Sequence, residues 1–348
     1  MKYIIYPHNG CGDHGSEARL RALLNLMSGV QTEVFSDAPE EDLRYWPQPL
    51  FSIRRSPAGP AFFQKTPGIR DIMLSFQGDH PLLFPQIPYR GPQVLLGASI
   101  PARMQPGDCL KLFAPYDLLF AYDKPSWNIL TRIHANAVYC PDPLFASLPQ
   151  AFLMPGALLR RDFIVFSINP EQTSQSSQLL FDSSVQLIRH LMDTTDFQIA
   201  LTPFVCQPER DDRTVLSSLY QIFSRSGRVV LLPELSSPKV HYLLTKARYA
   251  VTSYPAEAIL SYAALTPVLL LHDSSRALGI ARDLLGERRY HVLAPEEITD
   301  THTLIRALRA LSADETRVLR QLKAALPACQ EQLTYFRQAL RGLGSAVS

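Results

Sequence analysis

Short apolar runs alternate with longer amphipathic stretches along the whole chain. The runs are rich in β-branched and aromatic residues, which predicts buried strands, and the stretches carry leucines at helical spacing, which predicts helices. Such alternation is typical of α/β domains with parallel sheets. The expected strands cover residues 3–6, 31–35, 71–76, 93–97, 117–122 and 136–140 in the first half, and 163–167, 197–202, 228–232, 249–252 and 267–271 in the second.

The pattern restarts in the middle of the chain, near Pro141–Phe145. We therefore expect one Rossmann-like domain over residues 1–150, on the acceptor side, and a second over 151–300, on the donor side, facing each other across a cleft as in GT-B transferases. The chain turns helical after Ala294, and helices over 301–348 should pack back on both domains. A proline-rich stretch from Pro39 to Pro106 predicts loops and short elements.

The first predicted strand runs into a glycine-rich loop, Pro7–Glu17, and a helix over 18–27 follows at once. In a strand–loop–helix unit of this kind, glycines let the backbone approach a ligand, and the free N–H groups at the helix start attract an anion. The functional site should therefore lie at this loop.

Composition limits the function classes. The chain has 348 residues with a net charge of +2, too small to favour nucleic acid as a partner. No run approaches the roughly 20 apolar residues of a membrane span, and no secretory signal is expected. Five cysteines without paired spacing indicate reduced thiols in a cytoplasm. His8 and His14 flank the loop without a third ligand at a supporting spacing, so no metal is expected.

Seven short motifs stand in the same order here as in a known enzyme family. They are Asn9–Asp13 with Glu17, Gln77–Asp79, Gly97–Pro101, Asp117–Leu130, Asp142–Phe145, Val251–Glu257 and Thr266–Leu271. On these motifs the chain resembles the polysaccharide pyruvyl transferase family over nearly its whole length. The resemblance implies transfer of the pyruvyl group of phosphoenolpyruvate onto a sugar of a surface polysaccharide or its lipid-linked precursor. It also implies a cytoplasmic enzyme without a cofactor.

This chemistry needs a base for the sugar hydroxyl, an acid for the enol carbon, and cations for the carboxylate and phosphate. Asp13 is the expected base, with Glu17 as second choice, although a turn role for Asp13 and a helix-dipole role for Glu17 stay open. His272 is the expected acid and Arg276 the expected cation. The remaining substrate-binding candidates are Asn9, Gly10, Gly12, Gln77, Asp79 and Ser99.

Three residues depart from the family pattern where the chemistry needs charge. Tyr122 and Tyr254 stand where the family has arginine, and Ala256 stands where it has histidine. Arg276 stands where the family usually has lysine. Losing two cations and an imidazole weakens the case for a compact trianion as donor, so the donor stays open.

The second half also resembles the donor loop of GT-B glycosyltransferases. In that reading Ser253, Tyr254 and the backbone amides at a helix start hold the diphosphate of a nucleotide sugar, and Glu257 binds its ribose. A third reading is a non-catalytic family member in polysaccharide assembly. Arginines near the C-terminus could touch anionic lipid, although solvated helix faces explain such charges more often. The acceptor sugar, its linkage, the oligomeric state and catalytic competence are not fixed by the sequence.

Overall fold

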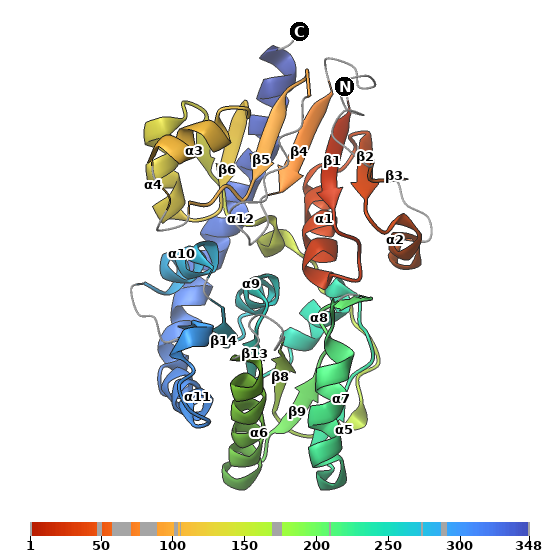
Figure 1. The fold of residues 1–348 in the computed structure, drawn as a ribbon, viewed down its shortest axis with the longest axis vertical. Coiled ribbons are helices and arrows are strands. Elements are labelled where there is room, and N and C mark those ends of the chain that lie inside the picture. Colours follow the sequence, from red (N-terminus) through yellow and green to blue (C-terminus); the bar gives the residue numbers. More distant parts are fainter. Residues whose placement is uncertain are drawn as a thin grey trace.

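A computed structural model describes residues 2–46, 51–57, 71–76, 89–100, 104, 106–168, 176–208, 210–272, 274–286 and 291–346. Within these residues the chain forms two parallel sheets, one above the other in Figure 1. This arrangement confirms the predicted α/β fold with two Rossmann-like halves. Gln77 and Asp79, two of the expected substrate-binding residues, lie outside the described residues.

The N-terminal sheet has the strand order β3-β2-β1-β4-β5-β6-β7 in the described part of the chain. Its strands are β1 Tyr3–His8, β2 Thr32–Ser36, β3 Ser52–Arg55, β4 Ile72–Phe76, β5 Gln93–Leu96, β6 Leu118–Ala121 and β7 Ala137–Tyr139. Its helices are α1 His14–Leu26, α2 Pro39–Tyr45, α3 Pro106–Phe113 and α4 Lys124–Ile133. Neighbouring strands all pair in parallel.

The C-terminal sheet has the order β12-β9-β8-β13-β14-β15 among the described residues. Its strands are β8 Phe163–Ser167, β9 Gln198–Leu201, β12 Val229–Leu231, β13 Tyr249–Thr252, β14 Val268–Leu271 and β15 Val292–Leu293. A small antiparallel hairpin, β10 Cys206–Gln207 with β11 Arg210–Asp211, projects from it. The helices of this half are α5 Gly156–Leu159, α6 Ser176–Thr194, α7 Asp212–Phe223, α8 Ser237–Leu244, α9 Pro255–Ala263, α10 Ser275–Leu285, α11 Thr303–Ala313 and α12 Glu315–Ala346.

Local sequence explains where several helices begin. Asp13, Asp123, Asp211 and Ser274 each precede a helix, and each side chain accepts a hydrogen bond from a backbone N–H of the first turn. Such N-caps satisfy donors that have no partner inside the helix. The caps of α1, α4 and α10 stand where a strand has just ended, so they place polar side chains at the carboxyl edges of the sheets.

The two halves share one apolar core. A single cluster of buried side chains runs from Ile5 and Leu20 in the first half through Phe204 and Tyr254 in the second. The long helix α12 closes it, because the Phe336 ring packs 4.7 Å from that of Phe120 on β6. In Figure 1 α12 passes beside both sheets. Among the described helices, none combines the length and apolarity that crossing a membrane requires.

Candidate functional site between the two domains

The glycine-rich loop between β1 and α1 makes backbone contacts with the second half of the chain. The carbonyl of Gly12 accepts from the N–H of Cys206 at 2.7 Å, and the N–H of His14 donates to the carbonyl of Phe204 at 3.1 Å. Asp13 and Val205 form an isolated antiparallel bridge. The loop that the sequence singled out therefore lies at the interface of the two domains.

Several polar groups of this loop already take part in hydrogen bonds within the protein. The Asp13 Oδ1 atom accepts from the N–H groups of Gly15 and Ser16, at 2.9 and 3.1 Å. Asn9 is exposed, and its carbonyl accepts from the side-chain amide of Gln207 at 2.7 Å. Gly10 has φ of +89°, a conformation that glycine adopts at little cost. Asp13 is the N-cap of α1. Its side chain is also partly exposed, and its expected role as a base stays a prediction.

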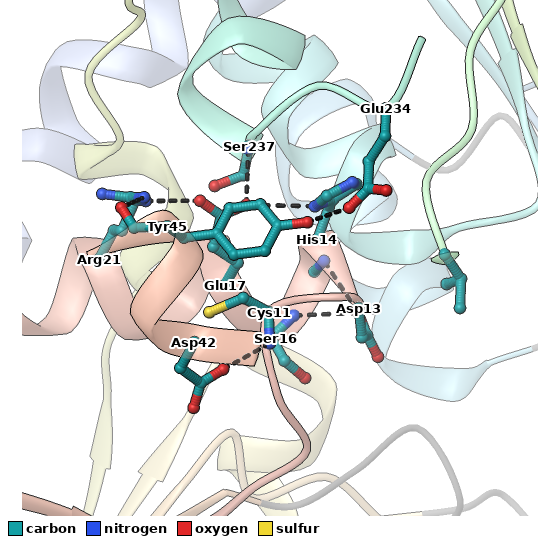
Figure 2. A network of polar contacts seen from close by, with 12 residues as sticks. Cys11, Asp13, His14, Ser16, Glu17, Arg21, Asp42, Tyr45, Glu234 and Ser237 are labelled. Atoms are coloured by element: carbon teal, nitrogen blue, oxygen red, sulfur yellow. Dashed lines mark hydrogen bonds and ion pairs between the residues drawn. The ribbon is translucent and has the colours of Figure 1, made fainter. Parts of the chain in front are cut away.

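Glu17 lies at the centre of a buried polar network (Figure 2). Its Oε2 atom accepts from the backbone N–H of Ser237 at 2.7 Å and contacts His14 Nδ1 at 3.2 Å, while Oε1 accepts from Arg21 Nε at 2.7 Å. Burial alone would raise the pKa of this carboxyl, but the His14 contact and the Arg21 charge outweigh it and lower the pKa. Both oxygens therefore have partners, and the bond from the Ser237 N–H to Oε2 joins α1 to α8.

The expected donor loop at the start of α9 faces α1 rather than open space. A Cβ atom placed on Gly15 would lie 2.9 Å from the Cβ of Ala256. Two helix N-termini thus meet in direct contact, and the backbone amides of α9 are covered in this arrangement. Ser253 is buried, and its Oγ atom has no hydrogen-bond partner among the described residues.

Tyr254 and Glu257 are built into the interior of the second domain. The Tyr254 hydroxyl donates to the Asp212 carboxylate. Glu257 is fully buried and accepts from the hydroxyls of Ser167 at 2.9 Å and Thr252 at 2.7 Å. Burial raises the pKa of Glu257 to about 8. Its expected contact with a ribose stays a prediction, one that would require α9 to be uncovered.

Arg276 crosses from α10 towards the first domain. It is buried, and its guanidinium lies so close to Gly97 that a Cβ on that glycine would be 2.9 Å from Nη1. His272, the expected acid, accepts from the N–H of Ser274 through Nδ1 at 2.9 Å. Ser99 is buried beside Ser126, with their hydroxyl oxygens 3.3 Å apart. The interface therefore holds the candidates of the glycine-rich loop together with Glu17 and Arg276, whereas the Tyr254 and Glu257 side chains bond within the second domain.

A cavity of about 490 Å³ opens between α4 and α10 and is lined by both domains. Asp123, the cap of α4, lines it; its Oδ1 atom accepts from Ser126 N at 2.8 Å, and its Oδ2 atom has no hydrogen-bond partner in the described part of the chain. Burial, with a smaller effect from the Asp283 charge, raises the Asp123 pKa to about 6. His291 also lines the cavity, with both ring nitrogens unpartnered among the described residues.

Sequence reasoning placed neither Asp123 nor His291 among the site residues. For Asp123 a signal existed, because it follows directly on the strand expected over 117–122 and thus belongs at the carboxyl edge of the sheet. For His291 there was none. It precedes β15, a strand of two residues, which is too short to be predicted from an apolar run.

Comparison with known proteins supports the fold. No family model and no curated protein sequence matches the chain. Among solved structures it is similar to S. aureus MnaA with UDP, at a TM-score of 0.64 and 14% identity over 92% of this chain and 91% of that one. It is also similar to the UDP-GlcNAc 2-epimerase of Methanocaldococcus jannaschii in complex with UDP-GlcNAc and UDP. The TM-score is 0.56, with 11% identity over 89% of this chain and 92% of that one. A third similar structure is sucrose-phosphate synthase from Thermosynechococcus elongatus, with a TM-score of 0.58 and 14% identity over 99% of both chains.

These neighbours have the GT-B fold, so the class of the chain is confirmed: two Rossmann-like domains of GT-B type. At such low identity the likeness establishes the fold alone. The neighbours named are an epimerase and a sugar-phosphate synthase beside the UDP-bound MnaA. The narrower resemblance to pyruvyl transferases therefore has no support from them.

Replacing Gly15 by alanine tests the contact between the two helix starts. The added Cβ would lie 2.9 Å from Ala256 Cβ and 3.1 Å from Asp13 Oδ1, so overpacking should lower the free energy of unfolding by about 1–3 kcal/mol. Urea denaturation measures the change. Gly107→Ala is the matched control, because Gly107 is also the second residue of a helix and a Cβ there meets nothing within 4 Å. Equal losses in both variants would contradict the contact.

Glu257→Gln tests the buried carboxyl. Between its ordinary pKa of 4.5 and the folded value of about 8, the folded chain holds a proton that the unfolded chain has released. The free energy of unfolding should therefore fall as pH rises through this window, by on the order of 1–4 kcal/mol. Glutamine cannot titrate, so the variant should lose this part of the slope in denaturation curves at pH 5 and pH 8. An identical slope in both proteins would show that the carboxyl is hydrated.

Proposed function

We propose that the protein is a GT-B glycosyltransferase that uses a nucleotide sugar and binds carbohydrate in the cavity between α4 and α10. The observation that carries this proposal is the Asp123 carboxyl: one oxygen is held by the α4 cap, the other is buried and unpartnered among the described residues, and the residue stands in the wall of a cavity that both domains line. Ligands of α/β folds bind at the carboxyl ends of parallel strands, and Asp123 stands at that end of β6.

The chemistry of such a site is direct. Asp123 takes the proton of an acceptor hydroxyl, whose oxygen forms a bond to the anomeric carbon while the bond from that carbon to the nucleoside diphosphate breaks. A carboxyl with a pKa of about 6 is largely ionised at neutral pH yet remains a stronger base than an ordinary aspartate. Arg282 on α10 lines the cavity, and the charge of Arg276 on the same helix acts on Asp123, so these two are the cations proposed to stabilise the departing diphosphate.

Pyruvyl transfer, the reaction implied by the resemblance, is the weaker proposal because its cation positions are filled by the protein interior. Tyr122 is buried next to Gly97, and Tyr254 is bonded to Asp212. Ala256 packs on Gly15. A trianion such as phosphoenolpyruvate would lose charge-assisted contacts typically worth about 1.5–3 kcal/mol each. A role in assembling a surface polysaccharide is compatible with either donor and stays part of the proposal.

The donor side requires movement of the domains. The backbone amides of α9 and the unpartnered Ser253 hydroxyl suit a diphosphate, but the Gly15–Ala256 contact covers them. We infer that a nucleotide enters an opened form and that the arrangement described here is the closed one. The solved neighbours in complex with UDP or UDP-GlcNAc support a uridine nucleotide as the first donor to test.

Ligand stabilisation separates the donor classes. A UDP-sugar at saturating concentration should raise the melting temperature measured by calorimetry, because a ligand that binds only the folded state stabilises it. Phosphoenolpyruvate at the same concentration should give no shift. A shift with phosphoenolpyruvate alone would restore pyruvyl transfer, and no shift with either would favour the non-catalytic reading and remove the glycosyltransferase proposal.

Asp123→Asn tests the base. Asparagine keeps an oxygen for the α4 cap, so the fold should persist while kcat/KM for transfer falls by about 10²-fold or more. In the wild type kcat/KM should rise with pH through about 6, and the variant should lose this limb. Asp211→Asn, which changes the cap of α7 outside the cavity, is the matched control and should leave turnover unchanged. Retained turnover in Asp123→Asn would remove it from the mechanism.

A further inference from the structure

Three metal-binding side chain types converge at the domain interface, outside the cavity discussed above. His14 stands at the start of α1, Cys206 in β10, and Glu234 in the loop before α8. One ligand atom from each lies within 4.8 Å of the others. Since His14 belongs to the first domain and the other two to the second, the cluster exists only when the domains are together.

The hydrogen bonding of His14 leaves one ring nitrogen available. Its Nδ1 atom is 3.2 Å from Glu17 Oε2, and because an ionised carboxylate only accepts, Nδ1 carries the hydrogen in that contact. In the neutral ring, the form that binds metals, Nε2 then bears a lone pair. It is fully buried and has no hydrogen-bond partner among the described residues. Metal-binding histidines almost always donate their other ring N–H to a carboxylate or carbonyl in this manner.

We propose that His14 Nε2, Cys206 Sγ and the Glu234 carboxylate bind a zinc ion. Imidazole, thiolate and carboxylate are the donors that zinc takes in proteins, and three protein ligands leave a fourth tetrahedral position for water or a substrate atom. Binding replaces the thiol proton of Cys206 by the metal and releases that proton to solvent. Thiolate and carboxylate together then neutralise the two positive charges.

The surroundings of Glu234 suit this role. Its side chain is 32% exposed, so the ion can enter from solvent. The Tyr45 hydroxyl donates to one carboxylate oxygen, shown as a dashed line in Figure 2, and Arg213 Nη1 lies 3.5 Å from the other. A ligand carboxylate held by outer hydrogen bonds is a regular feature of metal sites. The ion would therefore lock the closed arrangement of the two domains.

A second group, His8, Cys11 and Asp42, is also close enough to hold a metal. Here, however, the groups satisfy one another. Asp42 Oδ1 accepts from Cys11 N at 2.8 Å and lies 3.5 Å from His8 Nε2, which in turn lies 3.7 Å from Cys11 Sγ. The ring nitrogen that a metal would need already has partners. A variant in this second group therefore serves as the internal control for the metal-binding experiment.

Cobalt titration of the full-length protein, stripped of metal with a chelator, tests the proposal. Cobalt(II) replaces zinc in such sites and gives a thiolate charge-transfer band in the near ultraviolet. We expect the band to saturate at one cobalt per chain, to disappear in Cys206→Ala, and to persist in Cys11→Ala. Glu234→Gln should retain the band and weaken zinc competition at least tenfold. Circular dichroism checks that each variant is folded.

Two outcomes would overturn the site. One is the absence of a cobalt band in the wild-type protein at excess metal. The other is a band that survives in Cys206→Ala and is lost in Cys11→Ala, which would move the metal to the His8 group. Because the readout is metal occupancy and not turnover, the result is independent of the proposed glycosyl transfer.

Discussion

The buried carboxylate of Glu17 fixes how the two domains lie against each other. It is fully excluded from solvent and takes hydrogen bonds from Arg21 in its own helix and from the Ser237 backbone of the other domain. Removing one hydrogen bond from a buried charged group typically costs about 1.5–3 kcal/mol, since the charge is then less well compensated. Sliding α1 along α8 would break the hydrogen bond from the Ser237 N–H to Glu17. The backbone contacts of His14 and Gly12 with Phe204 and Cys206 follow from that position.

The strands were predictable because most strands of parallel sheets are buried on both faces and so appear as continuous apolar runs. β8, for example, is buried at every position. β3, a mostly exposed edge strand of Ser52–Arg55, and β15, of two residues, carry no such run and were missed. The predicted site loop is at the interface, but Glu17 was expected as a base. Its partner Ser237 stands 220 residues away, and no local pattern encodes that contact.

The three residues that differ from the pyruvyl transferase pattern, Tyr122, Tyr254 and Ala256, are all buried in this structure. Ala256 meets Gly15 with no space to spare, and a histidine at that position would force the two helix starts apart. Tyr122 and Tyr254 are buried, where an arginine would bring a charge that needs compensation. Small and aromatic residues in place of cations therefore let the domains pack directly on each other.

In the closed form, the centre of the interface and the cavity beside it differ in the free energy that a ligand must supply to enter. At the centre, opening must separate Glu17 from Ser237 and uncover apolar core, so binding energy from a ligand has to supply that free energy. Beside it, the cavity between α4 and α10 exists already in the closed form, and the Asp123 carboxyl is desolvated there without any movement. A catalytic base is most effective when its environment is set before the substrate arrives. For the proposed glycosyl transfer, the base would therefore be set in the closed form, while the centre of the interface would control whether a donor enters.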